Sequence, residues 1–498
     1  MERLSINLAD YGYAAQQDGL HVGAGSMANV DALNKALAAE QITGRDTTDL
    51  TTASGAPLKV ESLEKTLKHL TFRESDIRLW KDLPKKAAYN TVEEYNQQTS
   101  YGANRGGWNR EGELPEEEDS IYVRRAQLVK YLGVTKSVTH QMTLVNTMVG
   151  SIMERTIKDG TMWILRTLNQ GLYFGNEKLV PEQFNGFLAQ QAQSGAWASY
   201  DDYMGSEHVV DLRGGVLTED AIESGANSIV ENYGLATQIY GAPAVLSNFV
   251  KNFYGNKFIQ PNTPALSNGV MGQRVQAFDS QFGQIGLNHD VFFKKLPSKN
   301  ANSAATSQKA PAAPVWDSSN PIKVENSPAL SKFKTADAGN VYYAVSAINR
   351  FGESQLAIYG TAPAAIVAGC AVDLKFAAGV GTNAVTAFRI YRTKVGGAAT
   401  GEFYPLFEVS VAEKTAGYDG ASAGLIRDVN HFLPDCDQAM LVQFDNEVVE
   451  FAQLAPLMKM DLAVLSPAFR FMVLLYGTPF LYAPKKMVRF INIGTSRK

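Results

Sequence analysis

The chain has 498 residues, more than one hydrophobic core normally organises, so we expect two to four domains. Hydrophobic residues make up 45% and charged residues 19% of it, a composition typical of globular proteins. Lys and Arg number 46 against 50 Asp and Glu, a formal charge of -4. That balance argues against a surface that neutralises phosphates, because affinity for nucleic acid depends largely on Lys and Arg clusters. If DNA is a neighbour, we expect the protein to enclose it without binding it tightly.

Cysteine usage and hydropathy indicate the compartment. Cys370 and Cys436 are the two cysteines, too few for a disulfide framework, which favours assembly in a reducing cytoplasm. The first residues, MERLSINLADYGYAAQQ, lack the apolar core of a signal peptide. The apolar stretch FMVLLYGTPFLY is interrupted by Gly477 and Pro479 and is shorter than the roughly 20 residues of a membrane span. We therefore expect no membrane association.

The N-terminal part of the chain predicts an arm and then a long ribbon. Residues 1–84 form the expected arm and lead into the first compact domain, since residues 1–60 are rich in small and polar residues with little periodicity. Within residues 85–137, KKAAYNTVEEYN and EDSIYVRRAQLVKYLGVTKSV predict two strands joined by a polar, glycine-rich tip. A lone two-stranded ribbon is marginally stable in water. This extended loop is therefore expected to lie on another subunit.

Residues 138–310 begin with a long helix, predicted over 144–173, which would be roughly 40 Å long. Gly160 is expected to weaken its middle. A second helix is predicted at 219–233 with Thr218 as its N-cap, and then LATQIYGAPAVLSNFVKNF predicts a strand, a turn and a helix. VQAFDSQFGQIGLNHDVFF predicts two strands around a glycine turn. The apolar stripe of the long helix comprises Val145, Val149, Ile152, Ile157, Ile164, Leu168 and Leu172.

An abrupt change of composition after residue 297 predicts an inserted domain. SKNANSAATSQKAPAAPVWDSSNP is a linker by composition. Short alternating strands follow, so residues 311–431 are predicted to be a small β-sandwich, and residues 432–498 return to the longer apolar elements of the host domain. The expected core residues of the sandwich are Tyr343, Val345, Ala347, Phe388, Ile390 and Phe407.

Motifs that carry chemistry are few. HExxH, GxxxxGK[ST] and GxSxG do not occur, and the six histidines are scattered without metal-ligand spacing. GAGSMA at residues 23–28 loosely matches a dinucleotide fingerprint but follows no apolar strand, so a turn in the arm is the simpler interpretation. SLEK at residues 62–65 lacks the companion motifs of acyl-serine enzymes. The sequence therefore predicts no catalytic residues, cofactor or metal site.

An acidic run, PEEEDS, lies at the ribbon tip and contains Glu116, Glu117, Glu118 and Asp119. It lacks the alternating ligands and the glycine of a calcium loop. Two interpretations remain: a solvated acidic tip, or an acidic patch that meets a basic patch across a subunit contact. In the second interpretation, Arg124 and Arg125 of a neighbouring copy are the candidate partners.

Several segments resemble the major capsid proteins of tailed bacteriophages with the Hong Kong 97-type fold. Gln273-Arg274-Val275, followed by FGQIGL at residues 282–287, is similar to a segment of the capsid proteins of large myovirus-like phages, and LATQIYGAPAVLSNF resembles the element before it. The resemblance implies an α+β fold made of an N-terminal arm, extended loop, spine helix, and peripheral and axial domains. It covers most of residues 60–297 and 432–498.

The function implied by this resemblance is structural. Copies of the chain would self-assemble as hexamers and pentamers into the icosahedral head that encloses the DNA genome, without catalysis. Further partners would be scaffolding, portal and cement proteins, with packaged DNA as non-specific content. The protein would be part of the virion and would assemble in the cytoplasm of the host bacterium.

The insertion resembles an immunoglobulin-like or fibronectin type III module. YYAVSAINRFGES at residues 342–354 and FRIYRT at residues 388–393 look like fibronectin strands, although their order differs from the usual one. The resemblance implies that the insertion faces outward and contacts host-cell surfaces or neighbouring capsomers.

Two other functions stay open at this stage. One is another phage virion protein, a tail-tube, sheath or decoration protein with the same module; the long helix and the extended loop favour the shell over it. The other is a secreted glycan-active enzyme, which would need a carboxylate pair in a recognisable fold and, usually, an export signal.

Overall fold

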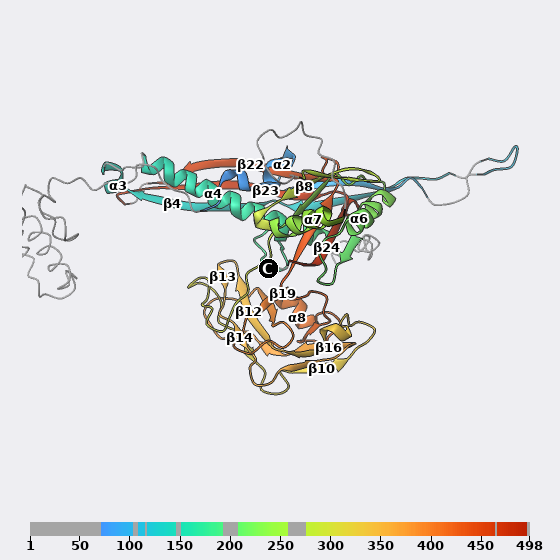
Figure 1. The fold of residues 1–498 in the computed structure, drawn as a ribbon. Helices are drawn as coiled ribbons and strands as arrows, with labels where there is room; N and C mark the ends of the chain where they lie inside the picture. Colours follow the sequence, from blue (N-terminus) through green and yellow to red (C-terminus); the bar gives the residue numbers. More distant parts are fainter. Residues whose placement is uncertain are drawn as a thin grey trace, which may run out of the picture. The chain divides into compact units, whose positions relative to one another are not determined.

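A long helix and two β-sheets form the framework of the chain (Figure 1). The computed structural model describes residues 71–102, 108–114, 117–145, 151–192, 208–256, 275–463 and 466–495. Helices and sheets both contribute to the core, so the predicted α+β class is confirmed. The arm predicted for residues 1–70 lies outside the described residues; residues 71–84 contain η3 (Glu74–Asp76) and α2 (Leu79–Asp82).

The first sheet has four strands and brings together distant parts of the chain. Its order is β1-β22-β23-β4, in which β1 is parallel to β22 and the other neighbours are antiparallel. β1 and β4 come from the first third of the chain, while β22 and β23 come from its end. The strands are β1 (Lys85–Ala87), β4 (Lys130–Thr139), β22 (Val449–Asp461) and β23 (Ala468–Leu481).

The long helix packs on this sheet. The prediction over 144–173 is confirmed for α4 (Ile152–Phe174), while the shorter α3 (His140–Leu144) precedes it and residues 146–150 lie outside the described part. Ile164, Leu168 and Leu172 of the predicted stripe are completely buried. Gly160 is buried too, and a Cβ placed there would lie 3.3 Å from Cγ2 of Val473 on β23. The glycine therefore serves close approach of helix and sheet.

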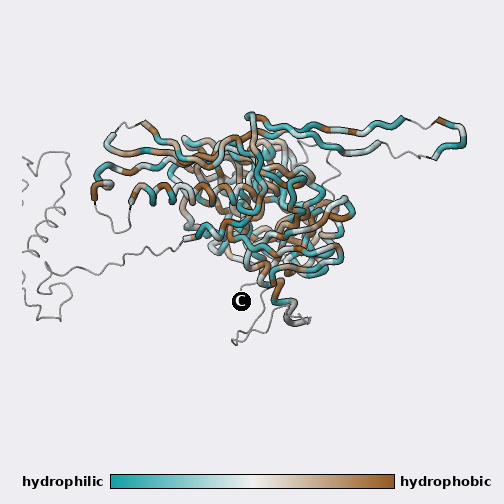
Figure 2. Tube along the Cα trace, turned by 90° about the horizontal axis from the view of Figure 1, so that it is seen from above, coloured by the Kyte–Doolittle hydropathy of each residue, from teal (hydrophilic) through white to brown (hydrophobic). Residues whose placement is uncertain are grey.

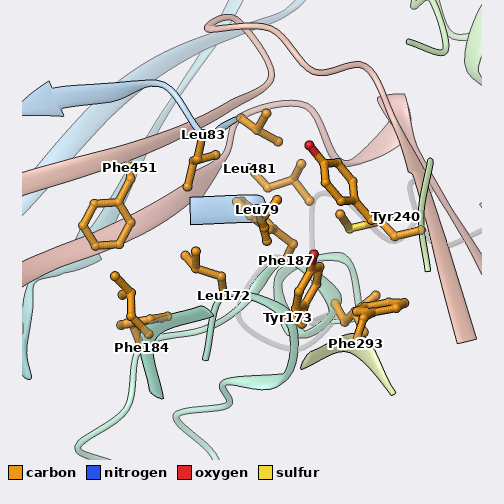
Figure 3. Packing of buried hydrophobic residues seen from close by; sticks show 14 of the residues in the cluster. Leu79, Leu83, Leu172, Tyr173, Phe184, Phe187, Tyr240, Phe293, Phe451 and Leu481 are labelled. Atoms are coloured by element: carbon orange, nitrogen blue, oxygen red, sulfur yellow. The ribbon is translucent and has the colours of Figure 1, made fainter. Parts of the chain in front are cut away.

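The core between α4 and the sheet contains many aromatic side chains (Figure 3). It also holds a buried carboxylate: Asp290 accepts hydrogen bonds from Asn169 (2.8 Å), from the Tyr173 hydroxyl (3.0 Å) and from the backbone N–H of Phe292 (2.8 Å). These bonds offset the cost of removing the carboxylate from water. The labelled members of the cluster are Leu79, Leu83, Leu172, Tyr173, Phe184, Phe187, Tyr240, Phe293, Phe451 and Leu481.

The second sheet has six strands in the order β5-β24-β21-β6-β8-β7. Helix α6 (Glu219–Glu231) begins at Thr218, whose side chain caps the N–H of Ala221, as predicted. The predicted strand, turn and helix are β6 and α7 (Pro243–Asn256). The predicted glycine turn joins β7 and β8 at Gly283, whose φ is +141°. The strands are β5 (Val209–Asp211), β6 (Gln238–Gly241), β7 (Ala277–Ser280), β8 (Gly283–His289), β21 (Cys436–Val442) and β24 (Met487–Gly494).

Short elements connect these layers. They are α5 (Phe187–Ala192), η6 (Val291–Phe293) and η8 (Pro484–Lys486). Both sheets contain strands from before residue 290 and from after residue 435. The C-terminal segment therefore completes sheets that the earlier part of the chain begins. Together with the long ribbon and helix, this order of elements is the one that the Hong Kong 97-type resemblance implies.

The intervening part of the chain forms β-sheets with a hydrophobic core of their own. Strand β12 lies in a sheet with β13, β14, β18 and β19, while β10, β16 and β20 form another and β11–β15 and β9–β17 form pairs. Of the predicted core residues, Tyr343, Val345, Ala347, Phe388 and Ile390 are buried and Phe407 is partly buried.

The elements of this β-domain, several of them labelled in Figure 1, are short. They are β9 (Val315–Trp316), β10 (Ile322–Asn326), η7 (Thr335–Asp337), β11 (Gly339–Val341), β12 (Tyr343–Asn349), β13 (Gly352–Glu353), β14 (Ala357–Ile358), β15 (Ala364–Ile366), β16 (Cys370–Leu374), β17 (Phe376–Ala377), β18 (Ala387–Arg392), β19 (Tyr404–Ser410), α8 (Val411–Ala416) and β20 (Ile426–Asp428).

The segment predicted to be a linker packs on the β-domain. Lys299 and Phe403 exchange two backbone hydrogen bonds of 2.9 and 2.8 Å, and the Lys299 ammonium lies 2.8 Å from the Glu353 carboxylate. Ala310 is buried. The composition misled because Ser, Ala and Asn residues satisfy their backbone groups on a neighbouring surface as readily as in water. The boundary at residue 311 stays a prediction, and this packing favours a start near residue 298.

The two chain crossings between the β-domain and the sheets lie side by side. The backbone N–H of Lys295 donates to Oδ1 of Asp437 (2.9 Å), and its ammonium lies 2.5 Å from Oδ1 of Asp435. Lys394 of the β-domain pairs with the other oxygen of Asp435 at 2.6 Å. Adjacent ends are the geometry that allows one domain to be inserted into another without disturbing it.

Because α4 packs on the core, shortening a side chain on its buried face should lower the stability of the subunit. Leu168→Ala should lower the free energy of unfolding of the unassembled subunit by about 2–5 kcal/mol, because it removes a fully buried side chain and leaves a cavity. Urea unfolding monitored by tryptophan fluorescence measures the change. Arg166→Ala, at an exposed position on the same helix, is the control. A loss for Leu168→Ala no larger than the control's would contradict this packing.

His431, in the chain crossing between β20 and β21, predicts that the stability of the subunit falls in acid. The pKa of His431 is lowered to about 4, because burial penalises the imidazolium and the cations of Lys332, Arg489 and Arg213 lie nearby, while Asp211 opposes them. The ammonium of Lys332 lies 3.1 Å from Nδ1 of the ring. Between pH 6.5 and 4 the unfolded chain binds this proton more readily than the folded chain, so stability falls as the pH falls. The loss is at most about 3 kcal/mol.

His431→Gln, whose amide oxygen can replace Nδ1 as an acceptor, should remove this part of the pH dependence. Urea midpoints at a series of pH values between 7 and 4 should therefore fall less steeply for the variant than for the parent chain. Equal slopes would mean that His431 does not titrate as its surroundings imply.

Candidate functional site

Strands β2 (Val92–Ser100) and β3 (Ile121–Leu128) form a separate antiparallel ribbon. It runs out from the sheet in which its neighbours β1 and β4 lie, and its tube is mainly hydrophilic with a few short hydrophobic stretches (Figure 2). Each predicted strand of residues 85–137 is thus divided, with one part in the ribbon and the other in the four-stranded sheet. The division arises because Leu132 and Val134 on β4 pack against the core, which the ribbon strands do not reach.

The base of the ribbon is held by the chain itself. The ring of Tyr95 packs edge-on against Phe480 at 5.5 Å and Tyr482 at 4.8 Å between ring centroids. The side chain of Gln127 donates to Oε1 of Gln190 at 3.0 Å. Val129, between β3 and β4, is buried and its N–H donates to the carbonyl of Thr91 at 2.9 Å. These contacts fix the base of the ribbon to the rest of its own chain.

The ribbon and its flanks expose large apolar side chains. Among the described residues, nine such side chains lie between Tyr89 and Tyr131, and Trp108 near the tip is 97% exposed. Water-exposed apolar surface at this density marks an interaction site. The nine are Tyr89, Val92, Tyr101, Trp108, Leu114, Ile121, Tyr122, Leu128 and Tyr131.

The tip is acidic. Residues 101–120 contain two arginines and six carboxylic acids. Of the predicted interface residues there, Glu117, Glu118 and Asp119 are exposed, and Glu116 lies outside the described residues. The structure describes one chain, so it leaves the subunit-contact interpretation of these residues a prediction.

The predicted basic partners lie farther along β3. Arg124 pairs with Glu94 at 3.5 Å, with its side chain 69% exposed, so this ion pair is weak and screened by salt. Arg125 is partly buried, and both arginines line a cleft of about 500 Å³ at the ribbon base.

Two further cations, Lys130 and Lys178, line the same cleft. Lys130 lies 2.7 Å from Oε1 of Glu177 and donates to the carbonyl of Pro181 at 2.7 Å. Lys178 follows α4 in the loop before α5, so no sequence spacing relates it to Arg124. The grouping of these cations arises from the tertiary fold, and the two adjacent arginines were its one signal in the sequence.

In the part of the chain that the structure describes, no group of three or more His, Cys, Asp and Glu side chains could hold a metal ion. No helix there is long and apolar enough to cross a membrane.

Comparison with known proteins agrees with the fold and the ribbon. The family model described as SU10 major capsid protein matches residues 46–326, more than half of the chain. This match includes the ribbon, α4, and the segments at 235–249 and 273–287 on which the resemblance rested.

Individual relatives cover almost the whole chain. The major capsid protein of Staphylococcus phage K is 24% identical over 476 residues, and that of Staphylococcus phage S25-3 is 25% identical over 476 residues; each alignment covers 91% of this chain and 93% of the relative. Among solved structures, the SrpI encapsulin complex from Synechococcus elongatus PCC 7942 matches with a TM-score of 0.43 and 8% identity, over 89% of this chain and 95% of that chain. On the strength of the family match, the chain belongs to the SU10 major capsid protein family.

Proposed function

We propose that this major capsid protein self-assembles as hexamers and pentamers into the icosahedral head of a tailed phage, with the ribbon as a principal contact between subunits. The observation that carries this proposal is the row of exposed apolar side chains on a ribbon with a firmly packed base. A projecting element of this kind gains stability when it lies on a neighbouring copy. Because the ribbon differs from the surface that would receive it, the contact is heterologous, the type that forms rings when the rotation between copies closes.

The same proposal assigns the chain a structural role without catalysis. Its near-neutral charge suits a container that holds DNA as non-specific content. Scaffolding, portal and cement proteins would be its further partners, and assembly would take place in the cytoplasm of the host before the protein becomes part of the virion.

For the β-domain we propose an immunoglobulin-like insertion that faces outward. The adjacent chain crossings at Lys295 and Asp437 support an insertion into a host domain. Its separate hydrophobic core supports independent packing. An outward position would leave its surface available to host-cell surfaces or neighbouring capsomers.

Electron microscopy of the purified protein tests the central proposal. Concentrated protein should form closed particles with five- and six-fold capsomers in negative stain. Tubes of stacked rings would instead support a tail protein, and a monodisperse monomer under all conditions would contradict self-assembly.

Charge reversal at the tip predicts a change in assembly kinetics. Replacing Glu117, Glu118 and Asp119 by Lys should slow particle formation at low ionic strength if the tip meets cations of another copy. The difference from the parent should shrink as salt is added, because exposed charges are screened over about 10 Å at 0.1 M. Light scattering during assembly measures both effects. Equal rates at low salt would leave the tip as a solvated acidic surface.

We predict that subunits without the β-domain still assemble into particles. Replacing residues 298–432 with a short Gly/Ser linker keeps Lys295 and Asp437, whose hydrogen bond brings the two ends together, and Leu433, whose N–H donates to Asn492 on β24. Both sheets retain all their strands, so particles should still form. Sedimentation and negative stain detect them. Insoluble or unassembled subunits would show that the β-domain is part of the shell's own architecture.

A further inference from the structure

The two ends of the ribbon differ in charge, and this difference suggests a specific subunit contact. Resting on the proposed self-assembly, we infer that the acidic ribbon tip of one copy docks into the cationic cleft at the ribbon base of the next copy. The inference joins the tip, residues 108–114 and 117–119 of one chain, to the cleft lined by Arg124, Arg125, Lys130 and Lys178 of another.

The cleft has the size and charge to receive a short acidic segment. Its volume is about 500 Å³, and four cations and one carboxylate, that of Glu177, line it. Lys130 is already paired with Glu177, Lys178 with Glu413 at 3.8 Å, and Arg124 with the exposed Glu94. The described residues of the tip, 108–114 and 117–119, carry five carboxylic acids against one arginine. The charges of tip and cleft are therefore complementary, which favours encounter in one orientation and opposes the reverse one.

An apolar notch adjoins the cleft and matches the rest of the tip. It has a volume of about 480 Å³ and shares Leu128 and Lys130 with the cleft. Its other lining residues are Thr91, Val129, Tyr131, Pro181 and Glu182, whose carboxylate pairs with Arg350 at 3.4 Å. Leu128 and Tyr131 are 51% and 59% exposed. At the tip, the side chains of Trp108 and Leu114 are 97% and 89% exposed. The acidic tip thus also offers apolar side chains, and the notch could bury them.

The tip cannot reach the cleft of its own chain. Strand β3 is extended from Ile121 to Leu128, so at about 3.3 Å per residue Asp119 lies roughly 16 Å from Arg124 at the near side of the cleft and roughly 30 Å from Leu128 at its far side. The packed ribbon base keeps the strand from folding back. A tip that docks in the cleft must therefore belong to another chain. A second copy carries a tip whose charge is opposite to that of the cleft.

Cysteine cross-linking tests the contact in assembled particles. Ser120→Cys next to the tip acids and Ala126→Cys on the cleft wall change neither charge set. A short bismaleimide should link them between chains and produce a ladder of covalent oligomers that ends at five and six chains. The native cysteines should react little, because Cys370 is buried and burial raises the pKa of Cys436 to about 11. The control pairs Ala126→Cys with Val380→Cys, which is fully exposed on the β-domain.

Each outcome of the cross-linking decides the matter. A ladder specific to the tip and cleft cysteines supports the inference. Particles without such links, or with Ala126→Cys joined to residues 1–70 of another copy in peptide mass spectra, would overturn it while leaving self-assembly intact. Absence of particles for the parent chain would overturn the proposed function, and the inference with it.

A charge exchange provides an independent readout. Arg124→Glu should slow assembly at low salt by roughly two- to fivefold, the range of an exposed ion pair. Adding Glu117→Lys to the same chain should recover most of the rate. Lys323→Glu is the matched control, because Lys323 is similarly exposed, at 65%, and has one weak partner in Glu325. No recovery in the double variant, or equal slowing by the control, would contradict docking of the tip in the cleft.

Discussion

Helix α4 packs against β4 and β23, and this packing fixes the sheet from which the ribbon extends. Ile164, Leu168 and Leu172 are completely buried beneath the sheet, and Gly160 lets the helix approach β23 closely. β4 continues into the ribbon through a single buried residue, Val129. The direction of the ribbon is therefore set by a core strand. A contact element anchored in this way loses little conformational entropy when it binds, because its base is already ordered.

Buried and exposed charges lie in different parts of the subunit. The core beneath α4 contains a buried carboxylate, Asp290, in a closed set of hydrogen bonds. The ribbon, in contrast, exposes charges to a partner, acidic at the tip and basic at the base. A subunit with unlike ends forms directional contacts, and directional contacts can close into rings. Weak exposed ion pairs would set orientation and rate, while the exposed apolar side chains would supply most of the free energy of association.

The β-domain is accommodated by the same framework. The chain leaves and returns at adjacent positions, Lys295 and Asp437, so the six-stranded sheet is completed by β21 and β24 without a gap. Within the domain, Asp428 accepts from Tyr343 at 2.8 Å and from Arg392 at 2.7 Å, a buried polar contact that joins its two larger sheets. Breaking one partner of a buried ion pair is costly, which favours a single arrangement of these sheets.

Local patterns in the sequence determined the local elements. Apolar periodicity located α4, Thr218 marked the start of α6, and a glycine marked the β7–β8 turn, because each depends on residues close together in the chain. Alternation also located most of the β-domain core. Alternation could not show that the strands of residues 85–137 divide between ribbon and sheet, or that the polar segment 298–310 packs on a domain surface.

The sequence pattern also could not predict that Lys130 and Lys178 lie beside Arg124 and Arg125. These features depend on long-range pairing, such as that of β4 with β23 more than three hundred residues later. Only the tertiary structure decides which distant surfaces meet.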